Sequence, residues 1–169
     1  NTYFINATHT IPIINICGDD IMSFITDQHP NSFSANFKGA IEYFGSDGIL
    51  IDEGAGDYNK HGNDSWAYDQ RGIDFIMRDQ LGYNYAIKHP IFRGKDRDRY
   101  QRLIIKAAAN DNISFENGGA HIRDAYVHSL SQVGGLRLDE RSYEPCILYV
   151  NGEYWGVYEV REKVDDDDF

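Results

Sequence analysis

Cysteine and proline are scarce in this chain, which has two of the former and four of the latter. Two cysteines are too few for the disulfide framework that stabilises small secreted domains. Because Cys17 and Cys146 each lie in a strand-like run, we expect two separate buried thiols. The low proline content, beside sixteen glycines, predicts many turns and little rigid linker.

Long apolar runs and an excess of positive charge are also missing. No apolar run approaches the ~20 residues that a membrane-spanning helix needs, so no transmembrane segment is predicted. Sixteen Lys and Arg stand against 27 Asp and Glu, giving a formal charge of −11, which argues against nucleic acid as a partner. No signal peptide is visible and the chain opens at Asn1, so we expect a processed or excised piece.

Aromatic residues are plentiful, with twelve Tyr and nine Phe among 169 residues. These side chains favour strands, because they pack well on a pleated surface. The length suits a single domain spanning residues 1–169, and 41% hydrophobic residues are enough for a sizeable core.

The hydrophobic pattern predicts several strands and one main helix. The strands are expected at 11–16, 40–44, 49–51, 72–77, 102–109, 145–150 and 153–160. The helix is expected at 120–133, where Ile122, Tyr126, Leu130 and Val133 form one apolar stripe.

Turn signals complete this pattern. Gly45 to Gly48 and the pair Asn151-Gly152 each predict a hairpin, because Asn, Asp and Gly tolerate positive φ. Residues 52–69 show little periodicity and are interpreted as a plain loop in preference to a glycine-rich phosphate loop. The sequence therefore predicts an α+β fold with a mostly antiparallel sheet and one main helix.

The last third of the chain carries a specific motif. Residues 149–158 read YVNGEYWGVY, and residues 160–165 read VREKVD. These segments resemble the CotH kinase (spore coat protein H) family, whose pattern combines an NGEYWG turn with a following acidic and basic pair. Looser agreement at 11–14 and at 103–111 extends the resemblance over nearly the whole chain.

The resemblance implies an atypical protein kinase that transfers phosphate from ATP, with Mg2+, to protein Ser or Thr. It further implies that this chain is the N-terminal, nucleotide-binding portion of such a domain, an atypical kinase N-lobe ending in a hinge at 161–165. The catalytic and metal-binding Asp residues of a kinase follow the hinge, so the C-lobe would be absent and the chain alone inactive. Family members tied to spore coats and cell surfaces imply an extracellular or cell-surface location.

Three residues are the candidate nucleotide-binding set: Arg71, Lys106 and Glu162. Arg71 stands where the family commonly has a Lys, and Trp66 stands near the position of a family Arg. Arg is not a neutral replacement for Lys, because its planar fork aims charge differently. Lys106 lies between apolar neighbours, so its burial would demand a partner. Glu162 either pairs with a cation in the cleft or is an ordinary carboxylate beside the hinge.

Two functions follow from these observations. The first is the nucleotide-binding portion of a kinase, with Arg71 and Lys106 pointing to one concave sheet face near Glu162. We expect that face to be open, to expose apolar surface and to support a homodimer. The second is a non-catalytic, CotH-like adhesion or interaction module, which the departures at Trp66 and Arg71 favour. The Asp165–Asp168 run is expected to be solvated and frayed, and no metal ligands are assigned.

Overall fold

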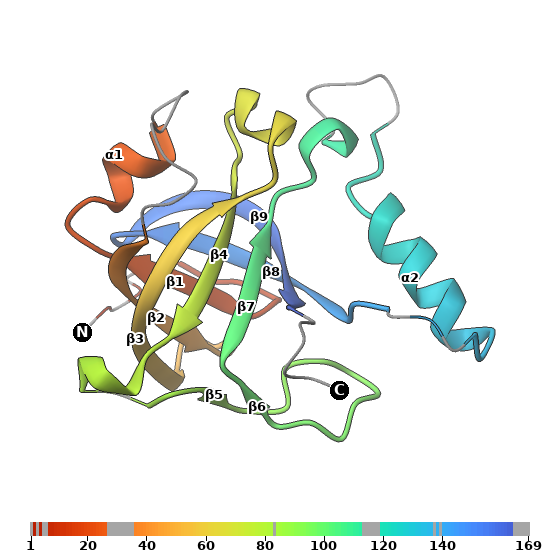
Figure 1. The fold of residues 1–169 in the computed structure, drawn as a ribbon, viewed down its shortest axis with the longest axis horizontal. Helices are drawn as coiled ribbons and strands as arrows, with labels where there is room; N and C mark the ends of the chain where they lie inside the picture. Colours follow the sequence, from red (N-terminus) through yellow and green to blue (C-terminus); the bar gives the residue numbers. More distant parts are fainter. Residues whose placement is uncertain are drawn as a thin grey trace.

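Seven strands dominate the fold. A computed structural model of the chain describes residues 2, 4, 7–26, 36–82, 84–112, 119–136, 138 and 140–163. The strands are β1 (Ile13–Cys17), β2 (Phe37–Phe44), β3 (Leu50–His61), β4 (Gly72–Met77), β7 (Arg102–Lys106), β8 (Tyr143–Val150) and β9 (Glu153–Glu162). They form a closed barrel in the order β1-β2-β3-β4-β7-β9-β8 (Figure 1).

The remaining elements are short, apart from one helix. They are α1 (Ile21–Thr26), α2 (Arg123–Val133), the 3-10 helices η1 (Asp64–Ala67), η2 (Asp79–Leu81) and η3 (Ala109–Asp111), and the strand pair β5 (Ile87–Lys88) and β6 (Arg99–Tyr100). Figure 1 shows α2 standing at the side of the barrel, away from α1.

The expected α+β fold, with an open sheet resembling a kinase N-lobe, is wrong. The sheet closes because β1 pairs with β2 on one edge and, in parallel, with β8 on the other. Hydrophobic alternation predicts where strands form but not which strands pair at the edges of the sheet. The sequence therefore does not predict the pairing of β1 with β8. Closure also removes the open concave face on which the nucleotide site was expected.

Side chains that alternate along the strands fill the barrel. Ile73 and Phe75 of β4 lie opposite Ile105 and Leu103 of β7, and all four are fully buried. At one end, Phe24 of α1 packs on Trp66 with 4.9 Å between ring centroids. At the other end, Phe92 and Tyr100 join the same core cluster. The barrel therefore has a solid interior closed by aromatic rings at both ends.

The glycines of β3 allow close strand contact. Residues 52–61, expected in a loop, belong to this twelve-residue strand. A Cβ added to Gly56 would lie 2.1 Å from the carbonyl oxygen of Ile76, and one added to Gly54 would lie 2.8 Å from the Met77 sulfur. Only glycine lets β3 and β4 approach this closely, so these residues mark tight packing here and not a loop.

The Asn151-Gly152 turn has a second role besides joining β8 to β9. Both residues have positive φ, 50° and 80°, which confirms the predicted hairpin. The Asn151 side chain also accepts a hydrogen bond from the Gly18 N–H at 3.0 Å and donates one to the Gly18 carbonyl at 3.1 Å. The barrel closes where β1 pairs with β8, and we call this pairing the seam of the barrel. The two bonds of Asn151 extend the seam beyond the ends of both strands.

Helix α2 presents its apolar side to solvent. The predicted stripe is exposed, from 51% for Ile122 and Leu130 to 88% for Val133. Within α2 only Ala125 and Ser131 are buried. The predicted helix is confirmed, and its polar side, not the apolar stripe, faces the barrel.

Two expectations from composition have clear outcomes. Cys17 and Cys146 are both free thiols. Cys146 is buried, as predicted, whereas Cys17 is only partly buried, and burial raises the pKa of both. No helix in the described part of the chain has the length and apolar character needed to cross a membrane. The predicted fraying of Asp165–Asp168 concerns residues outside the described part.

Candidate functional site

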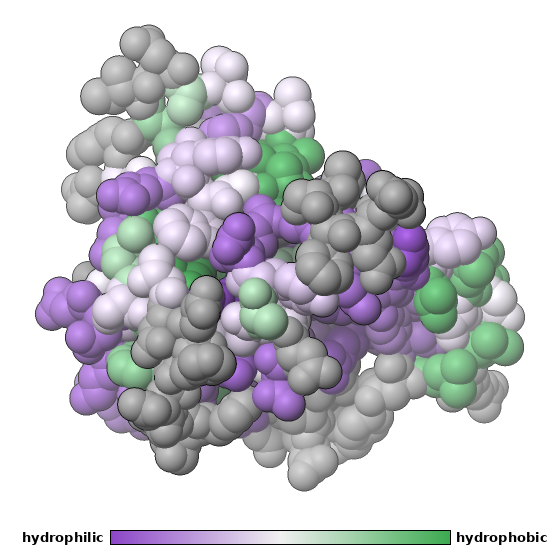
Figure 2. Space-filling model, turned by 90° about the horizontal axis from the view of Figure 1, so that it is seen from above, coloured by the Kyte–Doolittle hydropathy of each residue, from purple (hydrophilic) through white to green (hydrophobic). Residues whose placement is uncertain are grey.

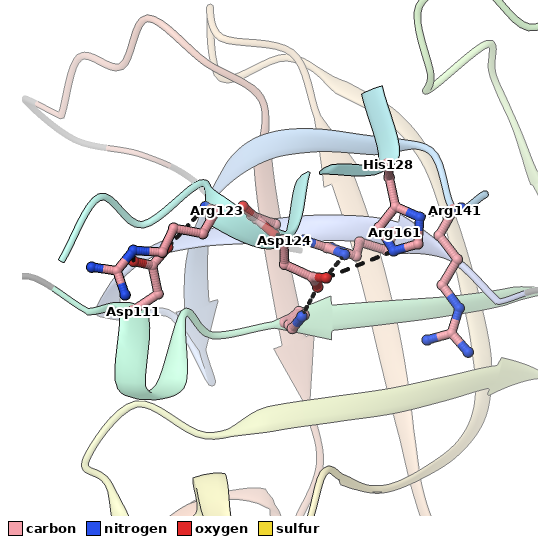
Figure 3. A network of polar contacts seen from close by, with 8 residues as sticks. Asp111, Arg123, Asp124, His128, Arg141 and Arg161 are labelled. Carbon is pink, nitrogen blue, oxygen red and sulfur yellow. Dashed lines mark hydrogen bonds and ion pairs between the residues drawn. The ribbon is translucent and has the colours of Figure 1, made fainter. Parts of the chain in front are cut away.

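A charged cluster lies on the outer face of β7 and β9, beneath the start of α2 (Figure 3). Lys106 is the last residue of β7, and it lies opposite Glu159 of β9. Its ammonium group donates to the Asp124 carboxylate of α2. Arg161 Nη1 donates to the same Asp124 oxygen at 2.7 Å, so two cations converge on one carboxylate.

Arg161 links this carboxylate to a second one. Its side chain is 2% exposed, and its Nε and Nη2 donate to Glu159 Oε2 at 2.9 and 2.6 Å. A buried guanidinium needs such partners, because an unpaired charge in the interior is costly. Lys106 differs in that 27% of its side chain is exposed. It is the more accessible of the two cations that hold Asp124.

The charge state of Asp124 follows from these contacts. Burial alone would raise its pKa, but hydrogen bonding from Lys106 and the charges of Arg161 and Lys106 outweigh burial and lower it. His128, one turn along α2, lies 3.7 Å from the other carboxylate oxygen. The carboxylate is therefore held ionised between its cationic neighbours.

Asp111 fixes the start of α2 and thereby places Asp124. Its carboxylate oxygens accept the N–H groups of Ala120 and Arg123, each at 2.9 Å, and its carbonyl accepts the N–H of His121. Arg123 Nε lies 3.0 Å from the same carboxylate. A carboxylate from outside the helix thus takes up donors at and just before its first turn.

A second ionic group lies further along the same outer face. Asp74 of β4 lies opposite Ile104 of β7, and its side chain therefore points outward as Lys106 does. Its oxygens lie 2.8 Å from His61 Nδ1 and 2.8 Å from Lys163 Nζ. Burial would raise the pKa of Asp74, but the hydrogen bonds from His61 and Lys163 lower it overall.

Arg71 lies elsewhere, at the end of the barrel interior. It is 4% exposed, and its Nη1 and Nε donate to the carbonyls of Ile25 and Tyr68 at 2.7 and 3.1 Å. Its guanidinium also stacks 5.4 Å from the centroid of the Trp66 ring. The two residues that depart from the family pattern thus pack against each other and close one end of the barrel.

Glu162 is bound by cations from the segment between β5 and β6. Lys95 Nζ contacts one carboxylate oxygen, and Arg97 Nη1 lies 3.0 Å from the other. Glu162 lies opposite Leu103, a core residue, and is 4% exposed. Of the two interpretations, the structure favours pairing with cations, although these cations come from this segment and not from Arg71 or Lys106.

The expected convergence of Arg71, Lys106 and Glu162 is therefore not found. Lys106 points outward, whereas Arg71 points to the barrel interior, so the prediction of a shared face is wrong. Lys106 does have the partner that its apolar neighbours demanded. Sequence reasoning missed Asp124 as that partner, and the placement of α2 over the β7 end is what reveals it.

The carboxylates in this region are already committed to cations. No group of three His, Cys, Asp or Glu side chains that could hold a metal ion occurs within the described part of the chain. Asp124, Glu159 and Asp74 each contact Lys, Arg or His nitrogens. These described carboxylates therefore do not fit a resident Mg2+.

Comparison with known proteins identifies the family of the chain. No curated protein matches it. The model of a protein family described as CotH kinase protein matches residues 58–169, which include the outer-face cluster, Arg71 and the YVNGEYWGVY segment. This match covers well over half of the chain and agrees with the resemblance seen in its last third. The chain belongs to the CotH kinase protein family.

Proposed function

We propose that this chain is the nucleotide-binding portion of a CotH-type kinase, with Lys106 as the residue that contacts the phosphates of ATP. The observation that carries the proposal is the Lys106–Asp124 ion pair between a sheet strand and a helix. Phosphoryl transfer depends on cations held in place at the phosphates, and a strand Lys oriented by a helix carboxylate is one way to provide them.

The surroundings of Lys106 support this role. Arg161, two residues from Glu159, adds a second positive charge that is buried and fixed. Asp124 can keep Lys106 oriented while Arg161 shares the carboxylate, so the ammonium retains donors for a phosphate oxygen. Arg71 and Glu162 are not proposed to contact the nucleotide. Arg71 already donates to main-chain carbonyls, and Glu162 is already paired with Lys95 and Arg97.

The rest of the proposal concerns the intact protein. We propose that the intact protein transfers phosphate to protein Ser or Thr, with a catalytic C-lobe and with Mg2+ carried by ATP. No residue of this chain is assigned as base or metal ligand. The association of the family with spore coats is consistent with a surface location, and we place the protein outside the cell or on its surface. Nucleotide binding is the part that this chain can test.

A lysine-reactive acyl phosphate of ATP provides the test. When the reagent binds, a nearby Lys amine attacks the acyl carbon, an amide forms, the acyl–phosphate bond breaks and ATP departs. Digestion and mass spectrometry then locate the acylated lysine. We expect Lys106 to be labelled and excess MgATP to block that labelling.

Lys88 supplies the matched control. It is an exposed lysine on β5 whose ammonium contacts Asn84, so the same digest measures non-specific labelling. In direct binding measurements, Lys106→Met should lower affinity for MgATP at least 10-fold, and Lys88→Met should leave it unchanged. If Lys106 is labelled no more than Lys88, or if MgATP does not protect it, the nucleotide assignment is wrong.

A second candidate is the non-catalytic interaction module. The exposed apolar face of α2 favours it, because a surface of this kind serves to bind a partner. It predicts no protected labelling at Lys106 and no measurable affinity for MgATP in a folded chain. The same labelling experiment therefore separates the two functions.

A further inference from the structure

The outward side of α2 and the turn after it form an exposed apolar surface. It consists of seven residues: Ile122, Tyr126, Val127, Leu130, Val133, Leu136 and Leu138. Figure 2 shows apolar residues gathered at the end of the molecule where α2 lies. Monomeric proteins rarely leave contiguous apolar patches beyond a few hundred Å2 uncovered, so this surface calls for a partner.

Rotation of the helix cannot bury this surface against the barrel, because the other side of α2 is held by polar contacts. Asp124 binds Lys106 and Arg161 at the start of the helix. One and two turns later, His128 Nδ1 accepts the Arg141 N–H at 3.3 Å and Ser131 Oγ donates to Glu140 at 2.5 Å. Within the described residues, no element of the same copy covers the apolar side.

The charge of the surface favours a second copy as that cover. Residues 125–136 contain no Asp, Glu, Lys or Arg, in a chain whose formal charge is −11. Two such chains repel each other wherever their acidic surfaces meet. Contact through an uncharged segment keeps those surfaces apart, whereas a basic partner would be drawn to the acidic surfaces instead.

The helix is also self-complementary when it pairs antiparallel. Tyr126, Leu130 and Val133 recur at steps of four and three, which forms a ridge that can pack against its own copy. Antiparallel packing also places each end of the helix beside the opposite end of the partner's helix dipole, which is the favourable arrangement of two dipoles. Seven residues of this size offer area on the order of the ~800 Å2 per partner of a standard interface.

We propose that two copies of this chain associate through the apolar side of α2, with the helices antiparallel about a two-fold axis. This interface uses none of the side chains assigned to nucleotide, and it does not depend on that function. An isologous contact of this kind closes on itself, so the expected product is a dimer and not a filament.

Sedimentation equilibrium on the 169-residue chain tests the proposal. We expect a dimer at or below about 100 µM, since interfaces of standard size commonly reach micromolar dissociation constants or better. Raising the salt concentration should strengthen association, because it screens the repulsion between the acidic chains while leaving apolar contact intact. Leu130→Glu combined with Val133→Glu should weaken association at least 10-fold.

Ile49→Glu is the matched control, because Ile49 is also an exposed apolar residue, at 65%, but lies in the β2–β3 turn. It should leave the dimer intact. Should the double variant lose its fold, Val133→Ser replaces it, since Val133 is 88% exposed and contributes little to the folded chain. A wild-type monomer at this concentration overturns the proposal, as does a dimer that survives the α2 changes or is lost with Ile49→Glu. A monomer whose α2 surface binds an apolar dye would also overturn it and would assign the surface to a different partner.

Discussion

The change Asn151→Asp tests the seam of the barrel with the replacement of one atom. The Asn151 amide makes two hydrogen bonds to Gly18, one as acceptor and one as donor. A carboxylate keeps the acceptor and tolerates the positive φ of the turn, but it places a charged oxygen against the Gly18 carbonyl. It also adds negative charge beside Asp19 and Asp20.

The expected loss follows from these contacts. One lost hydrogen bond costs about 0.5–1.5 kcal/mol net, and the repulsion from the carbonyl raises the total to about 2 kcal/mol. For a domain of this size, that lowers the midpoint of thermal unfolding by roughly 4–8 °C. The loss should shrink below about pH 4, because the protonated carboxyl can again donate to the carbonyl.

Urea unfolding followed by circular dichroism, at about pH 7 and at about pH 3.5, on either side of an ordinary carboxyl pKa, measures both effects. Asn63→Asp is the control, because Asn63 is exposed and makes no capping hydrogen bond with its side chain, while the change in charge is the same. An Asn151→Asp variant as stable as the wild type would refute the seam interpretation. A loss that does not depend on pH would refute the role of the lost donor.

Further predictions concern single positions. Gly152→Val should cost about 1 kcal/mol or more in urea unfolding, and entirely through the backbone, because φ is 80° and a Cβ there meets nothing within 4 Å. Gly156→Ala should destabilise the chain, because the added Cβ would lie 2.3 Å from the Gln70 amide nitrogen and because φ is 128° at this position. Adding Gln70→Ala should remove only the part of the loss that is due to the clash. Arg71→Met should cost at least about 2 kcal/mol in urea unfolding, through two lost charged hydrogen bonds, yet leave the labelling of Lys106 by the ATP reagent unchanged. Asp74 has a lowered pKa, so its contribution to stability is present above about pH 4 and lost as the pH falls through the folded-state pKa. In urea titrations between about pH 5 and 3, Asp74→Asn should flatten that loss.

Local elements were easier to predict from the sequence than their assembly. Gly72–Met77 matches the expected strand, and the Asn151-Gly152 turn has the expected backbone angles. Both depend on short-range chemistry, namely apolar runs and residues that tolerate positive φ. The pairing of β1 with β8 joins residues from opposite ends of the chain, and no local pattern encodes it.

The candidate site shows the same division. The demand of Lys106 for a partner was evident from its apolar neighbours, but the identity of that partner depends on where α2 lies. The apolar stripe of α2 predicted a helix, but only the contacts of Asp124 and Ser131 show that the stripe faces outward. Arg71 drew attention by its family position, and only its hydrogen bonds to the carbonyls of Ile25 in α1 and of Tyr68 show that it supports the fold.

The parallel pairing of β1 with β8 also sets an order of events during synthesis. β1 is complete at residue 17, but its second neighbour emerges only after residue 143. Until then one edge of β1 keeps unpaired N–H and C=O groups, and the sheet stays open, with an edge that can pair with other chains. Since contacts so distant in sequence form slowly, the last step on the ribosome or in refolding should be ring closure, and interruption before that step should favour aggregation.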